Sequence, residues 1–415
     1  MPVLFCFWGE GDPKCFNLEE DVELARRHRL TDGRTTVALN QLLRGGRVSM
    51  NRMMGFQAFV VGVALTISSL TVGIRVAAQE SDTWDPEAAA VYLDSRQALW
   101  MEWPTAARDH GTFCVSCHST VPYALARTVL RADAPGVVER RLLENIETRV
   151  SSWEKVRPFY SDEEYRVPKT SQSRGTEAIL NALMLANRDA RHGSLEETTL
   201  QAFDNLWALQ VTTGKEIGSW PWLNFGLEPW ETEAAQYYGA ALAAIAVGIA
   251  PDGYGSTPSI QKHLALLQEY LHREGDAQHL FNRVTALWAA AVLPGGLDSI
   301  QWQATIDEAL RRQQEDGGWS LVSLGMFERK DGTPLDTRSD GYATGLVVYT
   351  LQRVGMGADD PRLNKGLTWL RRNQNADGSW NASSLNKARD PDSNRGRFMK
   401  DVATAYAVLA LTEAK

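Results

Sequence analysis

Apolar residues recur at helical spacing along the chain after residue 118, in two kinds of segment that alternate. One kind carries a single apolar stripe with charged residues opposite it, as around Leu264, Leu267 and Leu271. The other kind is apolar on nearly every side and rich in Ala and Gly, as in the segment that follows Thr232. The first pattern is typical of a helix at the surface and the second of a buried helix, so the chain predicts pairs of outer and inner helices.

The inner segments begin with a repeated phrase, in which a polar residue and an acid precede small apolar residues. The acid, or an arginine in one copy, stands at Glu177, Glu233, Arg283, Asp340 and Asp401, which are 56, 50, 57 and 61 positions apart. One further period before Glu177 ends near His118, so six helix pairs are predicted. Such pairs cannot bury their apolar faces alone and must stack. We therefore expect an all-α fold, an (α/α)6 toroid.

A second phrase, Q-x-x-D-G-x-W, ends the outer segments at 313–319 and at 374–380, and a looser copy runs from Gln210 to Trp220. The Gly supplies the positive φ that terminates a helix, and the Asp before it favours the turn. The Gln is placed to bond the turn amides, and the Trp is placed to cover the joint between units. These phrases are therefore expected to be structural clamps.

The phrase resembles the QW repeat of squalene-hopene cyclases and of the wider prenyltransferase and squalene-oxidase-repeat superfamily, over roughly residues 170–415. The resemblance implies an (α/α)6 barrel. It does not extend to the chemistry, because the Asp-x-Asp-Asp acid motif of the cyclases is absent and the nearest string, 357–360, lacks the first acid. The zinc set of the protein prenyltransferases needs a cysteine, and none follows Cys117. A shared fold alone does not imply a shared function.

Cys114, Cys117 and His118 form C-x-x-C-H, the attachment signature of a c-type haem. It predicts a covalent haem c, with thioethers to both cysteines and His118 as the proximal ligand of the iron. A thiol redox pair is less favoured because no strand-then-helix pattern precedes the motif. A zinc site that includes His110 would need Cys117 and His118 as adjacent ligands, which suits a tetrahedron poorly. A short-loop disulfide is a further alternative.

The sequence leaves the second axial ligand of the iron open. The candidates are Met101, His110 and Met184, with Met326 and Met399 as further methionines. A filled position favours electron transfer, whereas an open one favours catalysis or gas binding. The segment 86–103 predicts an amphipathic helix that leads into the motif and covers the porphyrin.

The acids that open the inner segments are weak candidates for catalysis, since a toroid directs them to one end of a central cavity. These candidates are Glu177, Glu233, Asp340 and Asp401, together with the aromatic residues Trp222 and Tyr237. The competing interpretation is N-capping for the acids and loop packing for the aromatic residues. The run 390–394 has acids spaced as in a calcium loop but lacks its glycine, so a solvated loop is expected there.

Residues 50–78 predict a secretory signal, because Arg52 precedes an apolar run at 56–74 and small residues up to Ala78 offer a cleavage site. An uncleaved membrane anchor is the alternative. Residues 1–49, which carry Cys6 and Cys15, are interpreted as an upstream extension without fold content, and 79–415 as the toroid domain. With either interpretation the domain is expected outside the cytoplasm, in the periplasm or an equivalent compartment.

The chain carries 51 acidic and 43 basic side chains, a net charge of −8, which argues against nucleic acid as a partner. The leading hypothesis is an exported haem protein that transfers electrons to a redox partner or acts as a haem-dependent oxidoreductase. The first alternative is a terpenoid-processing enzyme with divergent acids and an apolar small-molecule substrate. The second alternative is a non-catalytic repeat module that binds a ligand.

Overall fold

The computed structural model describes residues 4–7, 14–17, 83–130 and 134–414. The chain divides into two compact units, 1–74 and 75–415. The predicted signal or anchor at 56–74 lies outside the described residues. Within the described residues, no helix combines the length and the hydropathy needed to cross a membrane.

In the first unit, β1 (Leu4–Phe7) and β2 (Lys14–Asn17) pair as antiparallel strands. These strands fall in the segment for which we expected no fold content. The other residues of 1–49 lie outside the described ones, so the prediction for that segment stays a prediction.

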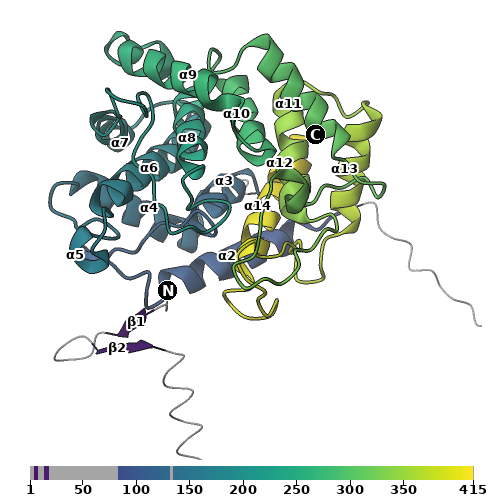
Figure 1. Ribbon diagram of the computed structural model, residues 1–415, viewed down its shortest axis with the longest axis horizontal. Coiled ribbons are helices and arrows are strands. Elements are labelled where there is room, and N and C mark those ends of the chain that lie inside the picture. Colours follow the sequence, from purple (N-terminus) through teal and green to yellow (C-terminus); the bar gives the residue numbers. More distant parts are fainter. Residues whose placement is uncertain (1–3, 8–13, 18–82, 131–133, 415) are drawn as a thin grey trace, which may run out of the picture. The chain divides into compact units, whose positions relative to one another are not determined.

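In the second unit, six helices form an inner ring, in which each packs against the next one along the chain (Figure 1). They are α3 (Thr120–Leu130), α6 (Thr170–His192), α8 (Ala235–Ile249), α10 (Leu280–Val292), α12 (Gly341–Arg353) and α14 (Phe398–Glu413). The last of these, α14, also packs against α3. This contact closes the ring, so the predicted all-α toroid is confirmed for this unit.

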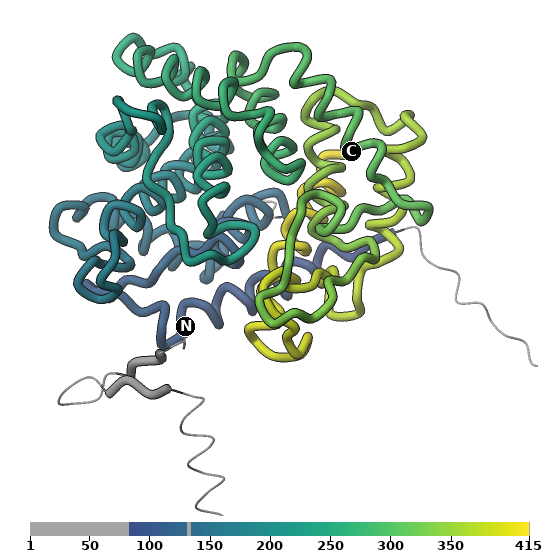
Figure 2. Tube along the Cα trace, viewed as in Figure 1, coloured from purple at the N-terminus to yellow at the C-terminus, as the bar shows by residue number. Residues whose placement is uncertain are grey.

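Six outer helices alternate with the inner ones in the sequence. They are α2 (Pro86–Met101), α4 (Val137–Ser151), α7 (Glu197–Ala208), α9 (Gln261–Gly275), α11 (Ser299–Arg311) and α13 (Pro361–Arg372). A short helix, α5 (Asp162–Tyr165), precedes α6, and 3-10 turns lie at Asp109–Gly111, Tyr254–Ser256, Pro258–Ile260 and Leu321–Leu324. Because α2 packs against both α3 and α14, the beginning and the end of this unit lie side by side (Figure 2).

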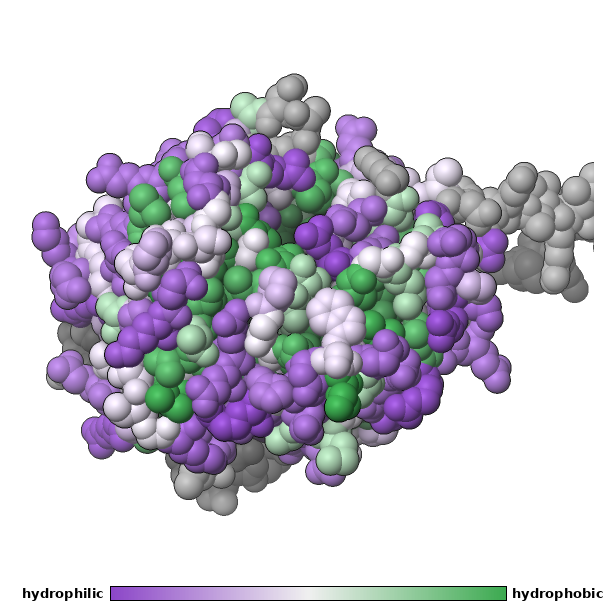
Figure 3. All heavy atoms as spheres, turned by 90° about the horizontal axis from the view of Figure 1, so that it is seen from above, coloured by the Kyte–Doolittle hydropathy of each residue, from purple (hydrophilic) through white to green (hydrophobic). Residues whose placement is uncertain are grey.

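The inner helices are buried as their composition predicts. Nearly every side chain of α8 from Ala235 to Val247 is buried, whereas each outer helix buries one face only. Small residues allow close approach: a Cβ atom on Gly345 of α12 would lie 2.6 Å from the backbone of Tyr406 in α14. On the face shown in Figure 3, hydrophilic side chains surround patches of hydrophobic ones.

The Q-x-x-D-G-x-W phrases join neighbouring outer helices. The Gln313 amide donates a hydrogen bond to the carbonyl of Gly317 in its own turn (2.8 Å) and another to the carbonyl of Arg362 at the start of α13 (2.8 Å). Gly317 has a φ of +93°, as the phrase predicts. Trp319 is fully buried and donates its ring N–H to the carbonyl of Ala309 in α11 (2.7 Å). The turn is therefore fixed to two outer helices at once.

The last of these clamps closes the ring of outer helices. Gln374 donates to the carbonyl of Gly378 (3.1 Å) and to the carbonyl of Asp85 (2.8 Å), and it accepts from the amide of Asp85 (2.7 Å). Asp85 is the N-cap of α2. Bonds between positions 289 residues apart thus tie the end of α13 to the beginning of the toroid.

Candidate functional site

The C-x-x-C-H motif lies in the turn that leads into α3, at the end of the ring where the inner helices begin. The Ser116 hydroxyl accepts hydrogen bonds from the amides of Ser119 (3.2 Å) and Thr120 (3.1 Å). Ser116 therefore caps the start of α3. This cap places Cys117 and His118 in the turn directly before the inner helix α3.

The loop before the motif is fixed by side chains of α4. The Asn145 amide accepts from the Phe113 N–H (2.7 Å) and donates to the Phe113 carbonyl (3.2 Å). Arg149 donates to the hydroxyl of Thr112 (2.8 Å) and forms a fully buried ion pair with Glu177 of α6 (2.5 Å). The position of Cys114 is thus set by two neighbouring helix pairs.

Both cysteines of the motif are free thiols, with Cys114 buried and Cys117 half-buried. Burial raises the pKa of Cys114 to about 12 and raises the pKa of Cys117 well above its ordinary value. A thiol redox pair needs a lowered pKa, because the thiolate is the nucleophile. The environment of these two thiols therefore does not favour that alternative.

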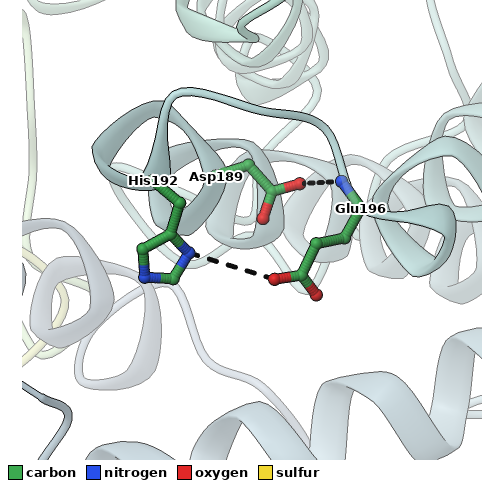
Figure 4. Close-up of side chains that lie close together, drawn as sticks. All are labelled: Asp189, His192 and Glu196. Atoms are coloured by element: carbon green, nitrogen blue, oxygen red, sulfur yellow. Dashed lines mark hydrogen bonds and ion pairs between the residues drawn. The ribbon is translucent and has the colours of Figure 1, made fainter.

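Among the described residues, one group of His, Cys, Asp and Glu side chains has ligand atoms close enough to share a metal ion, and it lies away from the motif. It consists of Asp189, His192 and Glu196, which flank the turn after α6 (Figure 4). Arg188 already forms ion pairs with Asp189 (2.7 Å) and Glu196 (2.9 Å). The guanidinium neutralises both carboxylates, so we interpret this group as a structural joint between α6 and α7.

His118 is oriented through a chain of hydrogen bonds that ends on a buried acid. Its Nδ1 lies 2.9 Å from the Ser119 hydroxyl, and this hydroxyl donates to Asp401 of α14 (2.9 Å). Asp401 also accepts from Arg96 (2.7 Å) and Tyr92 (3.0 Å) of α2. Burial raises the pKa of Asp401, and these donors act in the opposite direction.

The hydrogen bonds determine the tautomer of His118. Because Ser119 gives its single hydroxyl proton to Asp401, it accepts from His118, and Nδ1 must carry the ring proton. The lone pair of Nε2 is then available. An imidazole held in this way by its second nitrogen is the usual arrangement of a metal-ligating histidine.

Aromatic rings enclose the imidazole. Its centroid lies 3.9 Å from that of Phe398 and 4.8 Å from that of Trp100, with Trp230 at 6.5 Å. Burial lowers the pKa of His118 to about 3. The ring is therefore neutral at physiological pH, which is the form that binds a metal.

The donor set fits a covalently attached haem. Two thiols lie on one turn with an imidazole next to them, and the imidazole presents an unprotonated nitrogen.

The candidates for the second axial ligand lie in different environments. Met101, Met184 and Met399 are buried, and Met399 follows Phe398, whose ring stacks on His118. Met326 is fully exposed. His110 is exposed and pairs with its neighbour Asp109 (3.2 Å) at a residue with a φ of +56°.

The four acids singled out by the repeat separate into distinct roles. Glu177 is the buried partner of Arg149, and Glu233 is exposed. Asp340 is the N-cap of α12, where it accepts from the amides of Ala343 (2.8 Å) and Leu321 (2.6 Å). Of the four, Asp401 is the one that is linked by hydrogen bonds to His118, through Ser119. The structure therefore does not bring them together.

Asp340 nevertheless faces a pocket. Burial raises its pKa to about 7, although the two amides act in the opposite direction. The pocket has a volume of about 620 Å³, and its wall also contains Trp369, Arg389 and Lys400. It opens near the starts of α12 and α14.

The aromatic candidates Trp222 and Tyr237 do not contact the motif themselves, but each lies next to a residue that lies closer to it. Trp222 donates its ring N–H to the Trp230 carbonyl (2.7 Å), and Tyr237 donates to the Leu271 carbonyl of outer helix α9 (2.9 Å). Trp230 contacts His118, and Tyr238 interacts electrostatically with Cys117. Adjacent positions on an α-helix point about 100° apart, and the sequence does not tell which of them faces the motif.

Sequence reasoning missed Glu231, which is half-buried beside both cysteines. Burial raises its pKa to about 7, opposed by Lys169. Glu231 lies two residues before Glu233 and outside the repeated phrase, so no pattern in the sequence marked it as a candidate.

This arrangement of six helix pairs is that of the cyclase-like helical toroids. The family model of the squalene-hopene cyclase C-terminal domain matches residues 339–415, which contain α12, α13 and α14. No curated protein matches the chain. The match supports the cyclase-like superfamily for this part of the toroid.

Two of the solved structures to which this chain is similar are a polysaccharide lyase and a glycosyl hydrolase. A polysaccharide lyase is 12% identical, covers 80% of this chain and 90% of its own, and has a TM-score of 0.34. A glycosyl hydrolase family 88 protein from Bacteroides vulgatus is 10% identical, covers 80% and 91%, and has a TM-score of 0.29. Neither similarity carries an argument about function.

Proposed function

We propose that this chain is an exported c-type haem protein that transfers electrons or acts as a haem-dependent oxidoreductase. Cys114 and Cys117 would hold the porphyrin through thioethers, and His118 would bind the iron through Nε2. The observation that carries this proposal is the hydrogen-bond chain from His118 through Ser119 to Asp401. It fixes the imidazole with one nitrogen protonated and the other available.

A bound haem would supply one-electron chemistry. The residues of this chain would orient its histidine ligand and shield that ligand from water. Ser119 and Asp401 hold the tautomer of His118 and raise its basicity. Phe398, Trp100 and Trp230 keep water away from the imidazole. A haem with both axial positions filled would transfer electrons to a redox partner. A haem with one open position would act on a small substrate bound there.

The interior of the ring favours this proposal over a terpenoid-processing enzyme. Tyr238, Tyr342 and Tyr406 extend from three inner helices and are at most 3% exposed. Neighbouring aromatic rings contact each of them. Side chains therefore occupy the space in which a cyclase would hold its substrate, and the acid motif of the cyclases is absent.

Export is part of the same proposal. Haem attachment of this type takes place outside the cytoplasm, and residues 50–78 carry the features of a signal or an anchor. We propose a periplasmic or equivalent location, with membrane association through 56–74 if the segment is not cleaved.

A haem stain and a pyridine haemochrome spectrum test the proposal. The full chain, produced with a haem-maturation system, should show a covalent c-type band. The Cys114→Ser/Cys117→Ser variant should lose it, whereas Cys6→Ser/Cys15→Ser should retain it. A wild-type protein without a covalent haem, after such maturation, would overturn the proposal.

A further inference from the structure

The interior of the toroid contains a continuous column of oxidisable aromatic rings that starts at His118. The column consists of Trp230, Tyr342, Tyr406, Trp288 and Tyr349. Four of them are almost fully buried, whereas Tyr349 is half-buried. They come from the loop before α8 and from three inner helices, α10, α12 and α14.

Every step of the column is a direct contact. The centroid of Trp230 lies 6.5 Å from that of His118, and its ring N–H donates to the Tyr342 hydroxyl (3.0 Å). Tyr342 stacks on Tyr406 at 5.2 Å. Tyr406 contacts Trp288 at 6.4 Å, and Trp288 contacts Tyr349 at 5.2 Å.

The column leads away from the motif. Tyr342 lies in the first turn of α12 and Tyr349 lies seven residues later, a rise of about 10 Å along the helix. Tyr349 interacts electrostatically with Arg353 and Glu413, which form an ion pair at the ends of α12 and α14. The last ring therefore lies toward the opposite end of the toroid from His118.

Packing alone does not require these residue types. Leu or Phe would fill the same volume without bringing hydroxyl and indole N–H groups into the core, where polar groups are costly unless bonded.

We propose that this column is a relay that carries an oxidising equivalent from a haem at His118 to Tyr349; this inference rests on the proposed haem. With hydrogen peroxide as the oxidant, the O–O bond breaks, and the two oxygens take up two electrons and two protons from solvent to reach the oxidation level of water. A haem iron held by His118 would supply one of these electrons. The second leaves Tyr349 and passes through Trp288, Tyr406, Tyr342 and Trp230 in turn. Tyr349 releases its phenolic proton to solvent and becomes a neutral radical. The relay thus removes an oxidising equivalent from the haem pocket.

Radical trapping followed by peptide mass spectrometry tests the relay. The haem-loaded chain is treated with hydrogen peroxide and a nitrone spin trap, and adducts on Tyr349 are compared with adducts on Tyr165. Tyr165 is an exposed ring on the motif side, next to Tyr160. The ratio of the two adducts corrects for haem loading and for the reactivity of the iron.

Two matched substitutions separate a relay from simple packing. Trp288→Phe should lower the Tyr349 to Tyr165 ratio by about tenfold, which corresponds to about 1.4 kcal/mol on the transfer barrier. Trp207→Phe alters another buried indole, on outer helix α7 and outside the column, and should leave the ratio unchanged. Equal effects of both substitutions, or a wild-type chain that is never labelled at Tyr349, would refute the relay. A missing haemochrome band would instead refute the proposed haem itself.

Discussion

The region around the C-x-x-C-H motif is held together differently from the region of α11 to α14. Between α11 and α13, and again between α13 and α2, a glutamine and a tryptophan of the repeated phrase bind backbone groups of neighbouring helices. Around the motif, buried ion pairs make the joints, namely Arg149 with Glu177 and Arg96 with Asp401. The clamps position whole helices, whereas the ion pairs position individual side chains near His118.

This difference is sharpest when one partner of a buried ion pair is removed. Glu177→Ala leaves the Arg149 guanidinium uncompensated in the core, so we expect the free energy of unfolding to fall by about 3–5 kcal/mol. Urea titration followed by circular dichroism measures it. Asp336→Ala, which removes the partner of an exposed arginine, is the control and should cost less than about 1 kcal/mol. Equal losses in both variants would contradict the distinction.

The closing clamp should be the next most sensitive element. Gly378 has a φ of +84°, and a Cβ atom there would lie 2.2 Å from the backbone of Ala88 in α2. Gly378→Ala should therefore cost about 2–3 kcal/mol through strain and overpacking. Gly355 has a φ of +92° with no atom near its Cβ position, and its alanine variant should cost about 1 kcal/mol. Similar melting temperatures for the two variants would show that α13 does not clamp α2.

A smaller loss of stability is expected at Ser119, which links α14 to His118. Ser119→Ala removes the hydroxyl between His118 and Asp401 and should cost about 1–2 kcal/mol. In the haem-loaded protein it should also shift the midpoint potential, because Nδ1 loses its acceptor. Ser151→Ala, at the exposed end of α4, should change neither quantity. A potential that stays constant in Ser119→Ala would mean that the hydrogen-bond chain does not reach the iron.

The smallest expected effect is the change in the free energy of unfolding with pH. Burial raises the pKa of Glu231 from 4.5 to about 7, so between these values the folded state holds a proton that the unfolded state releases. Stability must then decrease as the pH rises through this range, by less than about 1.4 kcal/mol per pH unit because the side chain is partly exposed to solvent. Glu231→Gln should flatten this slope in urea titrations at several pH values. An unchanged slope would assign it to another group.

The repeats explain why the fold was predictable and much of the site was not. Helical spacing and the recurring Q-x-x-D-G-x-W phrase depend on local geometry, so both can be recognised in a single sequence. The pairing of Arg96 with Asp401, or of Arg149 with Glu177, joins residues whose proximity depends on closing the ring. Glu231 was missed for the same reason, since a shift of one or two positions decides which side chain faces the motif.

The bonds that close the toroid also impose an order of events on the growing chain. Asp401 follows Ser119 by 282 positions, so the imidazole cannot reach its final orientation until the last helix has been made. Cys114 is also buried in the complete toroid. For the haem attachment proposed above, a maturation enzyme would have to reach both thiols directly, and therefore to finish with the first helix pair before the sixth has docked.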